Sequence, residues 1–137
     1  MPPLLRNILA VIVGLVVCMA VNGFLIALSS SVIPLPTGIN PNDAKSIADN
    51  IDRYEVKHLI FPVLAHGLGS LIGAYIAALI AATHKMIFAV VIGLVHMSGG
   101  ITMAFLIPVP TWFIILDLGA AYLPAAWLGG KFAFRRA

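Results

Sequence analysis

Residues 58–83 read HLIFPVLAHGLGSLIGAYIAALIAAT, and this stretch contains no Asp, Glu, Lys or Arg. It is longer than the ~20 apolar residues that a helix needs to cross the hydrocarbon core of a bilayer. Within it, small residues recur at every fourth position, at Gly69, Gly73, Ala77 and Ala81. Such a stripe lets the backbone of a neighbouring helix approach closely inside a membrane. The stretch therefore predicts a membrane-spanning helix that packs against a second helix.

The composition extends this prediction to the whole chain of 137 residues, of which 61% are hydrophobic and 9% are charged. Soluble domains average roughly 45 to 50% and 25% for these two classes. We expect a single all-α domain over residues 1–137, with four spanning helices in an up-down bundle. Their expected limits are about residues 6–29, 58–83, 85–107 and 111–130. The fourth takes the carboxylate of Asp117 into the membrane, because Trp112 and the basic residues Lys131, Arg135 and Arg136 bracket it.

The basic residues at the helix ends predict the orientation of the chain. Arg6 precedes the first helix, Lys85 lies between the second and third, and more basic residues follow the fourth. The positive-inside rule then predicts a multi-pass inner-membrane protein with both termini in the cytoplasm. The first apolar stretch is too long for a cleaved signal peptide. The net charge of +3 comes from these flanks and gives no reason to expect a nucleic acid. The expected partners are the lipid bilayer and further copies of the chain, or a larger membrane complex.

The segment of residues 30–57 is long enough to have a structure of its own. Pro34, Pro36 and Gly38 end the first helix, because proline lacks the amide donor and glycine favours turns. Asn40 followed by Pro41 is typical of a helix start. Apolar residues then recur at helical spacing, namely Ala44, Ile47, Ala48, Ile51 and Tyr54. We predict a short amphipathic helix on the outer surface, either as a lid over a cavity or as a cover for the end of the bundle.

Two short patterns occur twice in the chain. Residues 10–16 read AVIVGLV and residues 89–95 read AVVIGLV, while residues 33–37 read IPLPT and residues 107–111 read IPVPT. One interpretation is a duplicated helical hairpin, whose copies would meet at a shared interface. The alternative is chance similarity between apolar helices.

The polar residues inside the predicted helices lie at similar depth. Asn22, His66, Thr102 and Asp117 are between five and eight residues from the outer ends of their helices, or roughly 8 to 12 Å at about 1.5 Å per residue. We expect a His66–Asp117 pair, with Asn22 and Thr102 satisfying the remaining hydrogen-bonding groups. An ionisable residue at membrane depth is a functional-site hypothesis by default.

Three interpretations of this polar layer remain open. The pair could be interhelical packing glue, because polar contacts between membrane helices are common. It could instead be a proton-linked or small-ligand site for binding or transport, because imidazole titrates near neutral pH. Catalysis or metal binding would rest on His66 and Asp117 alone, because the sequence has no HExxH, GxSxG or paired-cysteine motif. We therefore predict no catalytic residue and no metal ligand. Ser70, one helical turn from His66, is a secondary candidate that could be a nucleophile only in a loose sense.

The remaining histidines and the cysteine receive simpler interpretations. His96 is a secondary candidate, but it lies about six residues or ~9 Å deeper than His66, which makes a shared haem awkward. We predict neither haem nor another cofactor. His58 and His84 are predicted to lie at opposite edges of the membrane, where solvation by interfacial water explains the presence of a polar side chain. The lone Cys18 excludes an intramolecular disulfide and is interpreted as a packing residue.

Four segments resemble a group of small uncharacterised bacterial four-helix inner-membrane proteins. They are IPLPTG at residues 33–38, HGLGSLIG at residues 66–73, IPVPTWF at residues 107–113 and LGGK at residues 128–131. The resemblance covers most of the chain. It implies the four-helix topology, the proline turns and the outer helix, but it brings no activity, substrate or site residue.

The functional prediction is a small polytopic membrane protein with a buried polar layer of His66 and Asp117 near its outer face. The preferred role is proton-linked handling or binding of a small ligand. The alternative is a structural accessory subunit of a larger membrane complex, whose small-residue stripes would dock partner helices.

Overall fold

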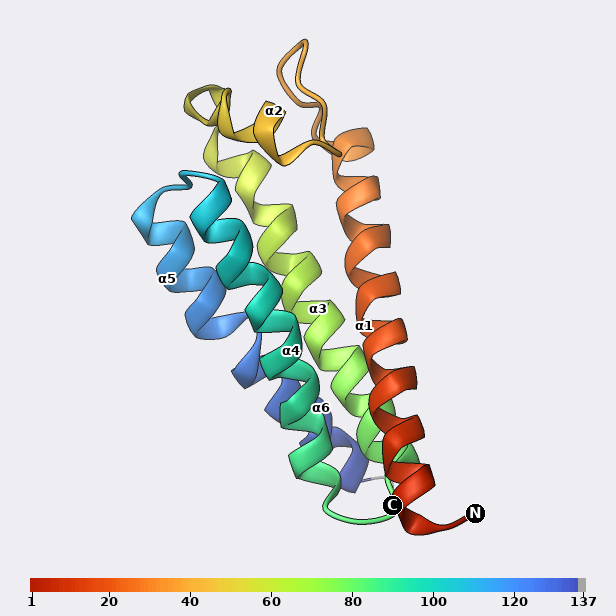
Figure 1. Cartoon of the computed structure of the whole chain (residues 1–137). Helices are drawn as coiled ribbons and strands as arrows, with labels where there is room; N and C mark the ends of the chain where they lie inside the picture. The colour runs from red at the N-terminus through yellow and green to blue at the C-terminus, as the bar shows by residue number, and fades with distance from the viewer. Residues whose placement is uncertain (136–137) are drawn as a thin grey trace.

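The computed structural model describes residues 1–135 as an all-helical, up-down bundle (Figure 1). Residues 33–55, between the first two long helices, form a cap over one end of the bundle. The elements of the chain are α1 (Pro3–Val32), α2 (Ala44–Ala48), the 3₁₀ turn η1 (Ile51–Arg53), α3 (Val56–Ile80), α4 (Lys85–Leu106), α5 (Thr111–Ala120) and α6 (Leu123–Phe134). Within these residues, four segments are long and apolar enough to cross a membrane, namely α1, α3, α4 and the stretch Thr111–Phe134. This confirms the four predicted apolar helices. Arg136, one of the predicted flanking basic residues, lies outside the described part of the chain.

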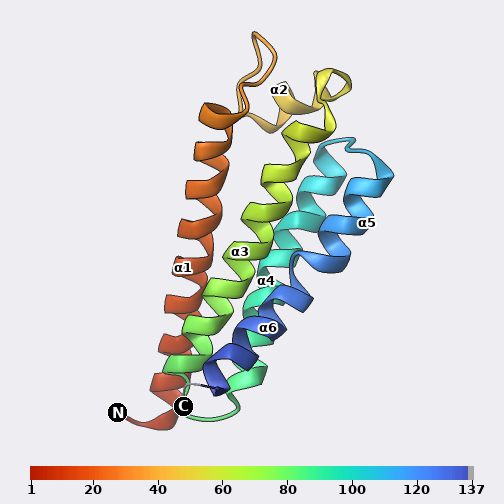
Figure 2. The ribbon, with the colours of Figure 1, turned by 180° about the vertical axis from the view of Figure 1, so that it is seen from behind.

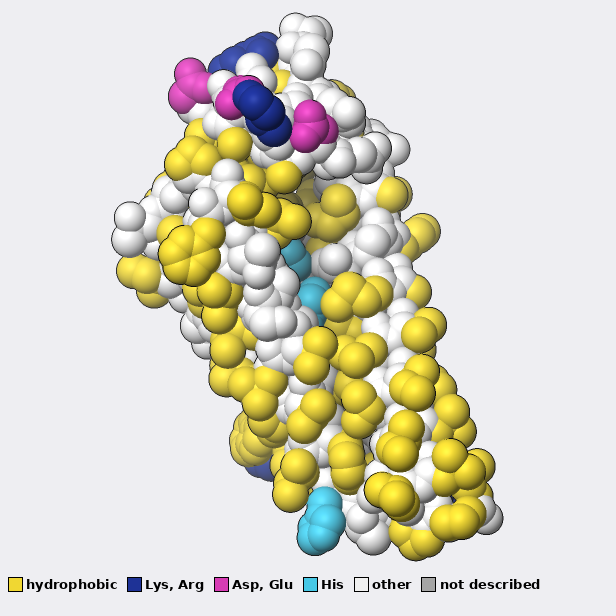
Figure 3. Space-filling model, in the orientation of Figure 1, with side chains coloured by type: hydrophobic (Ala, Val, Ile, Leu, Met, Phe, Trp, Pro, Cys, Tyr) yellow, Lys and Arg dark blue, Asp and Glu magenta, His cyan; other side chains and the backbone are white. Residues whose placement is uncertain are grey.

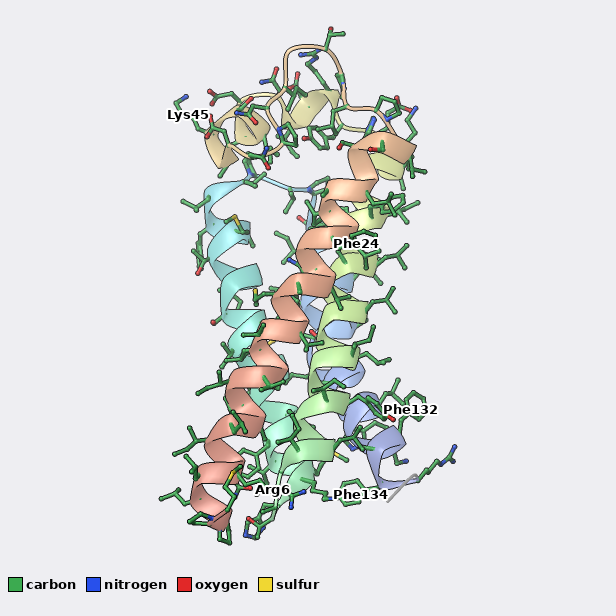
Figure 4. The ribbon with its side chains drawn as sticks, turned by 90° about the vertical axis from the view of Figure 1, so that its right-hand side faces the viewer. Arg6, Phe24, Lys45, Phe132 and Phe134 are labelled. Carbon is green, nitrogen blue, oxygen red and sulfur yellow. The ribbon has the colours of Figure 1, made fainter. Side chains whose placement is uncertain are left out.

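The surface of the bundle is apolar along its length and charged on the cap. Figure 3 shows Lys, Arg, Asp and Glu side chains gathered over α2, with apolar side chains covering the face below. Val16, Phe24, Ile87 and Ile115 are all exposed on the long helices. Lys45 lies at the outer edge of the cap, and Phe132 points away from α6 (Figure 4). This surface fits a multi-pass membrane protein, because exposed apolar patches this extensive are rare on soluble monomers.

Both ends of the described chain lie at the end of the bundle opposite the cap (Figures 1 and 2). The turn between α3 and α4 lies at that same end. The arrangement follows from an even number of long helices joined in antiparallel order.

The predicted small-residue stripe is the contact between α1 and α3. Gly69, Gly73, Ala77 and Ala81 are all buried. A Cβ atom added at Gly73 would lie 2.6 Å from Cys18 Cβ and 2.7 Å from the carbonyl oxygen of Gly14. Real Cβ atoms do not approach other atoms so closely, so glycine is required for the two backbones to meet here. The structure confirms the stripe as an interhelical contact.

The same kind of contact joins α6 to its neighbours. A Cβ atom at Gly129 would lie 2.2 Å from the carbonyl oxygen of Leu71 in α3. A Cβ atom at Gly93 of α4 would lie 2.7 Å from Ala126 Cβ in α6.

The two copies of the repeated apolar pattern therefore pack in a similar way. Gly14 of the first copy meets Ala77 of α3, and Gly93 of the second copy meets Ala126 of α6. The duplication itself stays a prediction.

The sequence predicts one helix for residues 111–130, but in the structure this fourth apolar segment is not continuous. It is interrupted at Ala121 and Tyr122, between α5 and α6. Pro124 explains the break, because proline has no amide hydrogen and its ring clashes with the carbonyl of the residue four positions earlier, here Ala120. The break also changes which side of the helix faces the bundle, so that Pro124 itself is exposed.

The cap contains less helix than predicted. The helix start expected at Asn40 and Pro41 is wrong, because α2 begins at Ala44 and Asp43 caps it by accepting a hydrogen bond from the amide of Lys45 (3.0 Å). Asn40 instead accepts a hydrogen bond from the amide of Asn42 (3.0 Å) and stabilises a turn before α2. Only five residues are α-helical here. A location of this segment on an outer membrane surface stays a prediction.

His58 ties the cap to the bundle. Its Nδ1 accepts a hydrogen bond from the amide of Glu55 (2.8 Å), so its Nε2 carries the ring proton and donates to the carbonyl oxygen of Pro34 (3.3 Å). The side chain is buried, and the predicted solvation of His58 at the membrane edge is therefore wrong. His84, at the opposite end, is exposed as expected.

We expect His58→Leu to loosen the cap, because it removes both of these hydrogen bonds, worth about 1 kcal/mol each. Limited trypsin digestion at Lys45 and Arg53 should become faster in this variant. The matched control is His84→Asn, because asparagine tolerates the left-handed backbone of His84 (φ 45). Equal digestion rates for the two variants would show that His58 does not hold the cap.

Candidate functional site

Asp117 is buried near the middle of α5, with 4% of its surface exposed. Its Oδ1 lies 2.7 Å from Nδ1 of His66, which α3 brings to the same level. The predicted contact between His66 and Asp117 is therefore present. The pair lies between helices, away from the charged residues of the cap.

Tyr122 completes the hydrogen bonding of the carboxylate. Its hydroxyl donates to Oδ2 of Asp117 (3.0 Å), and its ring is fully buried. Residues five apart in a continuous helix point about 140° away from each other. The break after Ala120 is what allows Tyr122 to reach back to Asp117. On the facing helix, a Cβ atom at Gly100 would lie 2.2 Å from this hydroxyl, so glycine leaves the necessary space.

A second polar group adjoins the first. Nδ1 of His96 lies 2.9 Å from Oγ of Ser70 and 3.3 Å from Sγ of Cys18, and all three side chains are buried. The ring of Tyr122 stacks on His66, with centroids 5.3 Å apart, and meets the edge of His96 at 5.1 Å. Tyr122 thus joins the two histidines into one polar network.

The two histidine rings are closer than the depth count suggested. Their centroids lie 5.7 Å apart in a perpendicular arrangement, so the expected axial separation of His66 and His96 is wrong. Side chains reach several ångströms along the helix axis, so two rings can meet although their positions along straight helices differ. Among residues 1–135, no three His, Cys, Asp or Glu side chains are placed to hold a metal ion.

Two of the predicted layer residues do not join the pair. Thr102 is exposed and donates its hydroxyl to the carbonyl oxygen of Ser98 in its own helix (2.9 Å), a common local bond for threonine. Asn22 packs against Gly69 of α3. Its Oδ1 is buried and has no hydrogen-bond partner among the described residues. The expectation that Asn22 and Thr102 satisfy the His66–Asp117 pair is therefore wrong.

A cavity of about 190 Å³ lies beneath the cap and extends to the pair. Residues of α1, α2, η1, α3, α4 and α5 line it, and His66 and Asp117 are among them. The other polar side chains in its wall are Ser29, Tyr54 and His58, and the remaining lining residues are apolar or glycine. Figure 3 shows histidine side chains at the bottom of a hollow between α1 and α4. The polar network therefore has an open side.

The open side presents a ring nitrogen. Asp117 is bonded to Nδ1 of His66, and Nε2 of His66 makes no hydrogen bond to the described residues. Within the same residues, Asn22 Oδ1 is the one fully buried side-chain N or O atom that lacks a partner. Nε2 of His66 therefore reaches open space. It is available to a small molecule or to water.

The sequence did not identify Tyr122 or Cys18 as members of this network. The sequence predicts only a packing role for Cys18. The position of Pro124 two residues after Tyr122 was the available signal, because a proline break can redirect the preceding side chains.

Comparisons with protein-family models, with curated proteins and with solved structures find no match to this chain. The resemblance to small bacterial four-helix membrane proteins stays a prediction. The interpretation of the site therefore rests on its own geometry.

Proposed function

We propose that this protein binds a small molecule in the cavity beneath the cap, and that the His66–Asp117 pair exchanges a proton with this molecule or with water. The protein would reside in the inner membrane with both termini in the cytoplasm. Arg6, Lys85 and Lys131 support this orientation, because these basic residues lie toward the end of the bundle opposite the cap.

The observation that carries the proposal is the contact between the cavity and the pair. Packing glue needs only contacts between side chains inside the bundle, such as the buried Ser70–His96 contact. His66 differs, because it lines the cavity together with its partner Asp117, whereas His96 does not line the cavity. Intramembrane ionisable residues that face a cavity commonly mark substrate or proton pathways.

The geometry also suits proton exchange. Asp117 holds one nitrogen of the imidazole and Tyr122 holds the second carboxylate oxygen, so both groups are fixed in orientation. A histidine held in this way presents its other nitrogen as the group that gains and loses a proton. The cap would then close the outer end of the cavity.

Infrared spectroscopy of the protein in lipid nanodiscs tests the proposal. The difference between the spectra of the wild type and Asp117→Asn isolates the bands of the carboxyl group. We expect these bands to respond to pH and to shift within minutes in heavy water, because the cavity beneath the cap reaches the pair. Glu55→Gln on the exposed cap serves as a control for surface carboxylates.

A band that is insensitive to pH and to heavy water would contradict the proposal and favour packing glue. Stoichiometric copurification of a membrane partner together with such a band would support the alternative, a structural accessory subunit. Asp117→Asn should retain its helical circular dichroism, because asparagine has nearly the same shape and can still form hydrogen bonds with His66 and Tyr122.

A further inference from the structure

We propose that the ligand of this cavity is a neutral, mostly apolar molecule of ring size that carries one hydroxyl group, such as a phenol, with the hydroxyl placed on Nε2 of His66. This inference rests on the proposed function and names its ligand class. Four features of the cavity lead to it.

The first feature is the absence of a free charge in the cavity wall. Asp117 is the one Asp, Glu, Lys or Arg among the described lining residues, and His66 and Tyr122 already occupy its two oxygens. The ion pairs Lys45–Asp49 and Lys57–Glu55 lie on the exposed cap. Burial raises the pKa of the Tyr54 hydroxyl above its ordinary value, so this lining group is also uncharged at neutral pH. An anion would lose its hydration without gaining a cationic partner in this wall.

The second feature is the single available nitrogen. When Asp117 is ionised, Nδ1 of His66 donates to it and Nε2 is an acceptor. When the carboxyl group carries the proton and donates it to Nδ1, Nε2 carries the other ring hydrogen and is a donor. A hydroxyl group pairs with Nε2 in both states, because its oxygen both donates and accepts. An ether or a carbonyl oxygen pairs in only one of them.

The third feature is the volume. An engineered apolar protein cavity of about 150 Å³ binds benzene. The present cavity of about 190 Å³ has room for one aromatic ring with a small substituent. Apolar lining residues such as Leu59, Met103 and Phe113 supply the ring contacts.

The fourth feature is the direction of access. The hollow in Figure 3 lies between α1 and α4, and apolar side chains surround it. In the proposed orientation this side faces lipid tails. A neutral molecule dissolved in the membrane reaches the cavity from there without passing the charged cap.

The test uses the full-length protein in lipid nanodiscs and three probes of nearly the same shape. These are para-cresol, its methyl ether para-methylanisole, and the anion para-toluate. Isothermal titration calorimetry measures their binding, and empty nanodiscs correct for partition into lipid. We expect saturable binding of para-cresol, about tenfold weaker binding of the ether, which is the effect of one hydrogen bond, and no saturable binding of the anion.

Two variants locate the binding. Ala104 lines the cavity from α4, so Ala104→Phe should fill the cavity while leaving His66 and Asp117 unchanged in sequence, and it should abolish para-cresol binding. Ala120→Phe is the matched control, because Ala120 is exposed on α5 and does not line the cavity. It should bind para-cresol as the wild type does.

The possible failures are distinguishable. Equal affinities for para-cresol and its ether would overturn the hydroxyl requirement, as would tighter binding of the anion. Unchanged para-cresol binding in Ala104→Phe would overturn the location. If no probe binds but the infrared bands of Asp117 respond to pH and heavy water, the ligand class is wrong and the proposed function stands. If those bands are also unresponsive, the proposed function fails as well.

Discussion

A single methyl group added at position 129 is expected to lower the free energy of unfolding by about 3 kcal/mol, at the upper end of the usual cost of overpacking. The Cβ atom of Gly129→Ala would lie 2.2 Å from the carbonyl oxygen of Leu71 and 3.0 Å from the amide nitrogen of Tyr75. These two atoms are four residues apart in α3 and belong to one helical hydrogen bond. They cannot move aside as the end of a flexible side chain can. Therefore α6 must separate from α3, or the hydrogen bond must distort.

Gly99→Ala is the matched control for this prediction. Gly99 also lies within a long helix, but a Cβ atom there would meet nothing within 4 Å. Alanine should stabilise this position by about 0.5 to 1 kcal/mol, because glycine loses more conformational freedom when a helix forms. Denaturant titration in mixed micelles, followed by circular dichroism, measures both changes. Similar unfolding free energies for the two variants would contradict the close approach of α3 and α6.

The features that could be predicted from the sequence are those that depend on local composition. The four apolar segments follow from the lengths of uncharged sequence. The spacing of Gly69, Gly73 and Ala77 predicts a close contact with a second helix, which the structure identifies as α1. The pairing of His66 with Asp117 required only that two polar groups at similar depth find each other inside an apolar bundle. Each of these inferences depends on spacing along one helix or on depth alone.

The features that could not be predicted depend on direction around a helix axis. Thr102 follows His96 by six residues, which turns an α-helix through roughly 600° and leaves the two side chains about 120° apart. Depth alone placed Thr102 in the polar layer, whereas its direction takes it to the surface. Tyr122 is the converse case, because only the break before Pro124 turns it toward Asp117.

The helix break thus has a consequence for the site as well as for the fold. A continuous helix through residues 111–130 would leave Oδ2 of Asp117 without the Tyr122 hydroxyl. With the break, the carboxylate is held on both oxygens while His66 keeps one nitrogen free. These two hydrogen bonds offset the free-energy cost of burying the carboxylate. They leave Nε2 of His66 open to the cavity.

Replacing Asp117 with leucine should therefore lower the free energy of unfolding by about 2 to 4 kcal/mol. The substitution leaves Nδ1 of His66 and the hydroxyl of Tyr122 without partners, and each buried unpaired group costs about 1 to 3 kcal/mol. Hydrogen bonds between membrane helices are worth less on average than this range, so we expect the lower part of the summed cost. Asp117→Asn should lose less than about 1 kcal/mol, because its amide can donate to His66 and accept from Tyr122. Both are measured by the same micelle titration.

A double-mutant cycle separates this cause from a general loss of packing. Tyr122→Phe removes the hydroxyl that Asp117→Leu would otherwise leave unpaired, so the double variant should be more stable than the sum of the two single losses predicts, by about 1 kcal/mol. Replacing both partners of a buried hydrogen bond with apolar groups is close to neutral, whereas replacing one is not. Strict additivity would mean that Tyr122 and Asp117 do not share a hydrogen bond in the membrane-embedded protein. In that case the carboxylate would be held by His66 alone, and the break before Pro124 would contribute to the fold without contributing to the site.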